Sequence, residues 1–197
     1  MEHRSRKSAS KSSSSRKAVA AKAKLRQAAS RLVRTRGGAG TRKTQTKQGV
    51  TDVQQFVRRL RRSTPIEIVE IEREGVRGSF IKDLSRRLEI PASRMFGILG
   101  VPKATAEKKA ATGEKVSGSG GQAAIGVAKL LAIAEEIVAN STAPDAKNFD
   151  AARWLGQWIE RPQPALGGRK PADLIDTPTG LNVVARLLGS IESGAYQ

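Results

Sequence analysis

The last fifty residues constrain the fold most, because they combine aromatic residues with closely spaced glycines and prolines in a chain that is only 4% aromatic. Both tryptophans, Trp154 and Trp158, and the single tyrosine, Tyr196, lie in this segment. Apolar residues recur at near-helical spacing over residues 149–159. This spacing predicts a short amphipathic helix that carries both indoles near one side and is stopped by Pro162.

A sharply turned connection and a final helix are predicted after the tryptophans. The pair Gly167 and Gly168 allows positive φ and close backbone approach, and Pro171 is suited to the first turn of a short helix. Apolar residues three or four apart over residues 181–191 predict a last helix that ends near Gly194. The segment is therefore expected to form a small packed helical module.

Thirteen residues of this segment form a pattern with fixed spacing. They are Trp154, Leu166, Gly167, Gly168, Pro171, Leu174, Asp176, Thr177, Gly180, Leu188, Gly189, Ile191 and Gly194. This pattern resembles the toxin-binding domain of the Xre/MbcA/ParS antitoxin family. The resemblance extends upstream, in the same order of segments, over residues 64–197, and it implies an antitoxin with an all-α fold.

The formal charge of +18 is concentrated in the N-terminal quarter of the chain. Residues 1–49 hold 15 lysines and arginines against the single acid Glu2, residues 50–120 hold 14 against nine acids, and residues 121–197 hold seven against eight. The first 17 residues are mostly Ser, Lys and Arg, a composition typical of disorder. We therefore predict that residues 1–49 are a disordered basic arm, closing with a polar linker over residues 41–49, and that a polyanion is one partner.

Ordered structure is expected to begin at Thr51. Thr51 with Gln54, and Thr64 with Glu67, have the spacing of capping boxes, so two helices are predicted to start there. The β-branched run after Pro65 is also compatible with a strand, but its cap signals favour a helix. Ser79 is expected to cap a further helix.

Residues 79–109 are predicted to form a helix-turn-helix. Two short apolar helices, a break at Gly100, and a third helix with polar and basic residues form the usual arrangement of this motif. Residues 99–105 also match the family's helix-turn-helix, whereas residues 109–121 depart from it. We predict DNA contacts at four residues of the third helix: Lys103, Thr105, Lys108 and Lys109.

The stretch from Ala123 to Ala139 is apolar nearly all round, so it is predicted to be a central helix covered on several sides, with a dimer seam as one possible cover. The glycine-rich run at residues 118–121 precedes it. No Gly-Lys-Ser/Thr sequence follows these glycines, so a linker and helix start are favoured over a phosphate-binding loop. The predicted domains are thus the arm at 1–49, the DNA-binding region at 50–120 and the toxin-binding domain at 121–197.

Several classes of function are disfavoured by the composition. The chain has no cysteine and a single histidine, His3, in the predicted arm, so we expect no metal site, no cofactor and no catalytic residues, and hence no enzyme. No apolar run approaches the roughly 20 residues of a membrane span. The N-terminus also lacks the apolar core of a secretory signal. The sequence therefore predicts a soluble cytoplasmic protein.

The resemblance implies a specific partner and mechanism. The partner is a RES-domain toxin that degrades NAD, neutralised by occlusion of its active site, and the antitoxin dimer binds operator DNA to repress its own operon. Toxin contacts are expected at Trp158, Leu166, Gly167, Gly168, Arg169, Pro171, Arg186 and Tyr196. The alternative is a nucleoid-associated or transcription-regulating protein that works mainly through its basic arm. In either case the arm is expected to bind DNA non-specifically through phosphate contacts.

Overall fold

A computed structural model describes residues 46–142, 146 and 148–193 of the chain. Its long helices and its two strands follow one another in the order α2 (Thr46–Arg62), α3 (Pro65–Glu74), β1 (Val76–Arg77), α4 (Gly78–Arg87), α5 (Ala92–Ile98), α6 (Lys103–Thr112), β2 (Lys115–Val116), α7 (Gly118–Ala139), α8 (Ala151–Ile159) and α9 (Pro178–Ser193). Between α8 and α9 lie two 3₁₀ turns, η2 (Pro164–Leu166) and η3 (Pro171–Asp173). The all-α prediction is confirmed, with one short antiparallel ribbon of β1 and β2 added.

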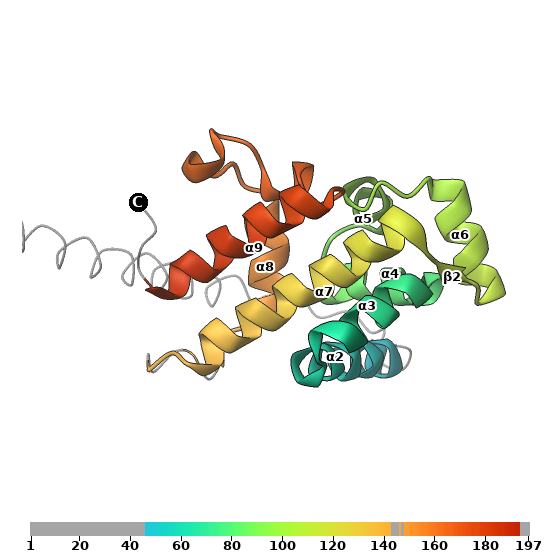
Figure 1. Ribbon diagram of the computed structural model, residues 1–197, viewed down its shortest axis with the longest axis horizontal. Helices are drawn as coiled ribbons and strands as arrows, with labels where there is room; N and C mark the ends of the chain where they lie inside the picture. The colour runs from blue at the N-terminus through green and yellow to red at the C-terminus, as the bar shows by residue number, and fades with distance from the viewer. Residues whose placement is uncertain (1–45, 143–145, 147, 194–197) are drawn as a thin grey trace, which may run out of the picture.

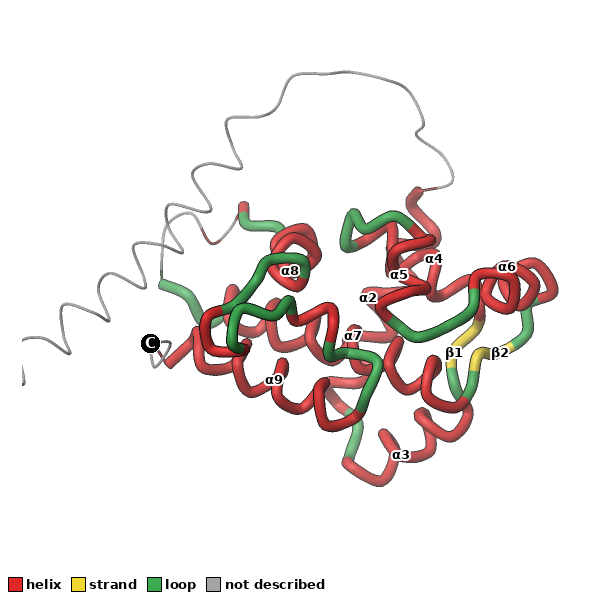
Figure 2. Tube along the Cα trace, turned by 90° about the horizontal axis from the view of Figure 1, so that it is seen from above, coloured by secondary structure: helices red, strands yellow, loops and turns green. Residues whose placement is uncertain are grey.

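Helix α7 is the centre of the fold. It packs against α2, α3, α8 and α9, and α9 runs alongside it (Figures 1 and 2). Most of its side chains are buried, including Ile125, Leu130 and Leu131. The predicted central helix is therefore confirmed, and the chain itself covers it on several sides.

The glycines at residues 118–121 form the first turn of α7, which confirms the predicted helix start, whereas no linker lies within them. A Cβ atom at Gly120 would overlap the Val101 side chain, and one at Gly121 would overlap the Val116 carbonyl. Glycine is needed here because the backbone of α7 approaches its neighbours too closely for a side chain. These two positions hold α7 against the turn of the predicted helix-turn-helix, between α5 and α6, and against the ribbon.

The helix starts agree only partly with the sequence signals. The Thr64 hydroxyl accepts from Glu67 N and the Glu67 carboxylate accepts from Thr64 N, which confirms the capping box and the helix at α3. By contrast, α2 begins at Thr46, so Thr51 is inside the helix and the end of the predicted arm, residues 46–49, is helical. Helix α4 begins at Gly78, so Ser79 is not its cap. In both cases the helix begins before the residue that carries the local cap signal.

The C-terminal unit follows the predicted pattern. Asp150 caps α8 by accepting from Ala152 N and Arg153 N at 3.1 Å each. The Thr177 hydroxyl accepts from Gly180 N at 3.1 Å, so the Thr-Pro step does begin α9. The predicted arm up to residue 45, and the residues after Ser193, lie outside the described residues.

Over the described residues, no helix combines the length and the apolar character that crossing a membrane requires.

Candidate functional site

The tryptophan helix α8 forms one wall of the C-terminal unit. The Trp154 and Trp158 rings stack with centroids 5.9 Å apart and an interplanar angle of 19°. Phe149 packs on Trp154 with centroids 6.2 Å apart. Trp158 is only 7% exposed, so its ring belongs to the core and offers little surface to a partner.

The loop between α8 and η3, residues 161–170, closes on itself through backbone hydrogen bonds. Gln163 N donates to Arg169 O at 3.0 Å, and Gly168 N donates back to Gln163 O at 3.0 Å. The Gln163 side chain is buried, and its amide donates to Arg161 O at 3.0 Å and to Trp158 O at 3.4 Å. One buried glutamine therefore ties the loop to the last turn of the tryptophan helix.

The tip of this loop is exposed and has a fixed backbone shape. Gly167 has φ 64° and Gly168 has φ 79°, and a Cβ atom at either would meet nothing within 4 Å. These glycines are therefore required for their positive φ and not for lack of space. Figure 1 shows the loop projecting from the body above α9. Arg169 is exposed next to the glycines, Leu166 is half-buried, and Pro171 is buried.

Charged side chains anchor the base of the loop to the neighbouring helices. Arg94 of α5 donates to Glu160 at 2.6 and 3.2 Å, and it lies 3.6 Å from the Asp173 carboxylate. Lys170 also contacts Glu160, at 3.4 Å. The hydrogen bond from Arg94 lowers the pKa of the Glu160 carboxyl and raises the pKa of the guanidinium. The loop is thus joined directly to the helix-turn-helix region.

The remaining predicted toxin-facing residues are less closely grouped. Arg186 is exposed on α9, in the helix that runs beside α7. Tyr196 lies outside the described residues. The structure therefore brings together five of the predicted residues, Leu166, Gly167, Gly168, Arg169 and Pro171, whereas it buries Trp158 in the core and places Arg186 on a separate helix.

The predicted DNA-contacting residues lie on α6. Lys103, Thr105 and Lys108 are exposed, and within the described part of the chain their side chains make no ion pair or hydrogen bond. The Lys109 ammonium differs, because it donates to Lys115 O at 2.7 Å and so helps to hold the ribbon. Three of the four side chains are therefore available to a ligand.

Helix α6 is anchored on the side that faces α4 and the ribbon. A Cβ atom at Gly78 would overlap the backbone of Lys109 and Ala110, so α4 and α6 touch backbone to backbone. Lys82 of α4 contacts Glu107 of α6 at 2.6 Å. The ribbon residues pair as Val76 with Val116 and Arg77 with Lys115, which closes the far end of α6. This anchoring gives the exposed face of α6 a defined position.

No group of three or more His, Cys, Asp or Glu side chains suited to a metal ion occurs among the described residues.

Comparison with known proteins agrees with this geometry. Residues 147–194, which contain the tryptophan helix, the loop and α9, match the family described as antitoxin Xre/MbcA/ParS C-terminal toxin-binding domain. The chain is also 38% identical over 137 residues to a protein from Sphingobium sp. (strain YBL2) named Prs ADP-ribosylating antitoxin. That alignment covers 70% of this chain and 85% of the relative.

This chain belongs to the Xre/MbcA/ParS antitoxin family. The antitoxin is one component of a toxin–antitoxin system, and its partner is a cognate toxin. Within the family-matched segment, the loop of residues 161–170 presents an exposed tip on a backbone that its own hydrogen bonds hold.

Sequence reasoning missed the residues that build the loop from inside. Gln163 gave no signal, because a glutamine between two prolines has the appearance of an exposed turn residue. The pairing of Arg94 with Glu160 gave no signal either, because the two residues are 66 positions apart in the sequence.

Proposed function

We propose that this antitoxin neutralises an NAD-consuming toxin of the RES fold by covering its NAD site. The name of the Sphingobium relative associates that protein with ADP-ribosylation, a reaction in which NAD donates the ADP-ribose group. Degradation of NAD and ADP-ribosyl transfer both require NAD to bind and both break its bond to nicotinamide. A toxin whose NAD site is blocked can carry out neither reaction.

The observation that carries this proposal is the exposed, self-closed loop within the family-matched segment. A loop whose shape is fixed before binding loses little conformational entropy on association, which favours affinity. Leu166, Gly167, Gly168 and Arg169 would contact the toxin directly. Pro171 and the buried Trp158 would support the loop, and Arg186 and Tyr196 would extend the contact.

We also propose that α6 binds operator DNA and that the antitoxin thereby represses its own operon. The side chains of Lys103, Thr105 and Lys108 are exposed on a helix that is fixed from behind, which is how a recognition helix is presented to a major groove. Lys109 would contribute less, since its ammonium is bound to Lys115 O. An antitoxin homodimer would read a site with two-fold symmetry.

Co-expression with the cognate toxin tests the first part. The intact antitoxin should restore growth, preserve cellular NAD and co-purify with the toxin. Arg169→Glu should weaken co-purification, whereas Arg161→Glu, at an exposed residue beside the loop base, should not. Removal of Tyr196 and Gln197 should weaken protection if the C-terminus enters the toxin. Equal protection by every variant would contradict the proposed surface.

A DNA-binding regulator that acts mainly through its basic arm is the second candidate, favoured by the charge of residues 1–49. Removal of residues 1–45, which spares α2, separates the two proposals. The antitoxin should still neutralise its toxin without the arm, whereas a regulator that depends on the arm would lose its function.

A further inference from the structure

An arginine cluster on α2 has no role in the sites described above. It comprises Arg58, Arg59 and Arg62, which line a shallow depression together with Gln55, Ser63 and Glu67. We propose that this cluster, the α2 arginine face, binds the phosphodiester backbone of DNA. The inference rests on the proposed DNA binding and adds to it a surface that contacts phosphates and not bases.

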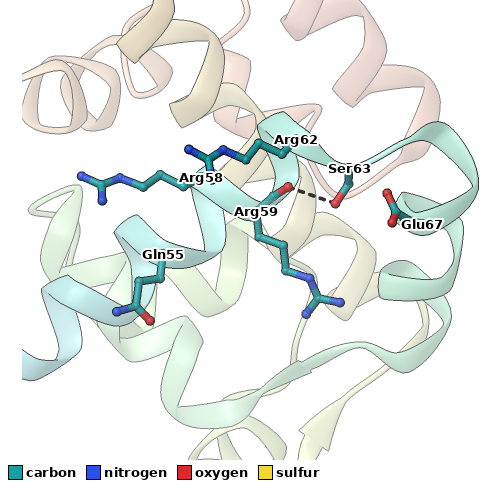
Figure 3. Close-up of a pocket in the computed structure, with 6 residues that line it drawn as sticks. All are labelled: Gln55, Arg58, Arg59, Arg62, Ser63 and Glu67. Carbon is teal, nitrogen blue, oxygen red and sulfur yellow. Dashed lines mark hydrogen bonds between the residues drawn. The ribbon is translucent and has the colours of Figure 1, made fainter.

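The geometry of α2 presents these arginines together. Val53, Val57 and Leu60 are buried and form the core face of the helix. Gln55, Arg58, Arg59 and Arg62 recur three or four residues apart on the opposite face. Figure 3 shows the Arg58 and Arg62 side chains extending in the same direction from the helix. Two guanidinium groups one turn apart are therefore presented to the same side.

The charges of this face are largely uncompensated. Among the described residues, no carboxylate forms an ion pair with Arg58, Arg59 or Arg62. The one acid of the depression, Glu67, is engaged in the cap of α3, where it accepts from Thr64 N at 2.6 Å.

Two of the three arginines also attract acids that they do not contact. The pKa of Glu67 is lowered chiefly by the hydrogen bond from Thr64 N and that of Glu74 chiefly by Lys115, and Arg59 adds a smaller attraction to both. Burial raises the pKa of Glu135, and Arg58 is one of several arginines that oppose this effect. Because Arg58 and Arg62 extend in the same direction, they are the pair best placed to take a new anion.

The position of α2 fits the backbone of a duplex bound at α6. Helices α2 and α6 both pack against α4, each at about the usual interhelical distance of 8–10 Å, so a single helix separates them. The major groove is about 12 Å wide and is bordered by phosphates on both strands. A helix one element away from the recognition helix is therefore within reach of phosphates beside that groove.

The basic residues that precede α2 favour the DNA backbone over an acidic protein surface as the ligand of this face. Residues 1–45 hold 14 basic residues against one acid, and they lead directly into this helix. Arginine binds phosphate oxygens through two parallel N–H groups, so arginines are well suited to phosphate contacts. The α2 arginine face would thus continue the cationic sequence that precedes it.

The salt dependence of DNA binding gives the first test, with the full-length antitoxin and a duplex containing the operon's promoter. Each phosphate contact contributes about 0.9 to the slope of log K against log salt, so R58Q/R62Q should lower the slope by about 1.8. The control R153Q/R161Q removes the same charge from α8 and from the first residue of the loop that follows it, and it should leave the slope unchanged. Sequence preference should be the same in all three proteins, because phosphate contacts do not read bases.

The absence of cysteine allows a second test that does not depend on affinity. A photo-crosslinker attached to Arg62→Cys should crosslink to the duplex, whereas the same reagent on Arg161→Cys should not. Crosslinking from residue 62 together with a reduced slope for R58Q/R62Q would support the proposal.

The failures of the two proposals can be distinguished. A full-length antitoxin that binds no promoter DNA would overturn both the proposed repression and this inference. DNA binding with an unchanged slope for R58Q/R62Q and no crosslink from residue 62 would overturn only the α2 arginine face. A slope lowered equally by R153Q/R161Q would also overturn it, since the effect would then come from net charge alone.

Discussion

The loop of residues 161–170 and helix α6 are both presented to a partner, but they are held in opposite ways. The loop is fixed from within, by the Gln163 side chain, by two backbone hydrogen bonds across its neck and by positive φ at its glycines. Helix α6 is fixed from outside, where its backbone lies against Gly78 of α4 and where the ribbon closes its end. A substitution should therefore harm the loop when it changes local hydrogen bonds or φ, and should harm α6 when it adds volume behind it.

Gly78→Ala should have the largest effect. Its Cβ atom would overlap the backbone of α6, which cannot rotate away as a side chain can, so the folded state should lose about 2–3 kcal/mol. Urea unfolding would measure the loss, and DNA binding should fall more than toxin binding. Gly97→Ala is the matched control, because a Cβ atom there meets nothing within 4 Å. Equal stability of the two variants would mean that α6 is not held by close backbone contact.

Gln163→Leu should have the second largest effect. The substitution removes the amide that donates to Trp158 O and Arg161 O and places an apolar group among them, at a cost of about 1–3 kcal/mol. Toxin co-purification should decrease while DNA binding stays unchanged. Gln157→Leu, at a half-buried residue whose side chain accepts only from Arg161, serves as the control. A loss of DNA binding in Gln163→Leu would show that the loop and α6 are not independently held.

Gly168→Ala should have a smaller effect that comes from backbone conformation alone. A left-handed conformation costs an alanine about 1–2 kcal/mol relative to glycine, and there is no clash to add to this. Gly168→Asn should be milder, since asparagine tolerates positive φ better than alanine does. Thermal unfolding of the two variants would rank them, and the reverse order would mean that φ is not what constrains this position.

Loss of the ion pair of Glu160 should have the smallest effect on stability, and this effect should depend on pH. The pKa of this carboxyl is lowered in the folded state, chiefly because of the hydrogen bond from Arg94. The carboxylate therefore stabilises the folded state fully at pH values above its ordinary pKa. This contribution is lost as the pH falls through the lowered pKa. Glu160→Gln should cost up to about 1 kcal/mol at pH 7. Urea unfolding at pH 7 and pH 3 should show the difference from the unsubstituted protein shrinking in acid. A difference that is constant with pH would contradict this role.

Much of the fold was predictable because its signals are local. The Thr64 cap, the tryptophan helix, the Thr177 start of α9 and the apolar stretch at 123–139 are each encoded by neighbouring residues, and the structure confirms them. The start of α2, the ribbon and the role of the glycines at 120 and 121 were not predictable in this way. The ribbon and the two glycines depend on distant partners, such as Val101 and Val116, which a local pattern does not contain.

The candidate site, like the fold, was predictable only where its signals are local. The exposed glycines of the loop were found because their spacing is fixed, whereas the loop's internal ties were not found. Gln163 is buried and donates to the carbonyls of Trp158 and Arg161, and Arg94 reaches Glu160 across 66 residues of sequence. Residue type and spacing can indicate a sharply turned loop, but the side chains that shape it become evident only from the folded structure.

The central position of α7 also bears on how such a protein can evolve. Because the same helix forms a wall for α2 and for α9, neither half of the chain has a complete core of its own. A recombination event that replaced one half with the corresponding half of a distant relative would bring together two mismatched faces of α7. New toxin or operator specificities are therefore expected to arise by substitutions in the exposed loop and on α6, and the two halves to be inherited together as one piece.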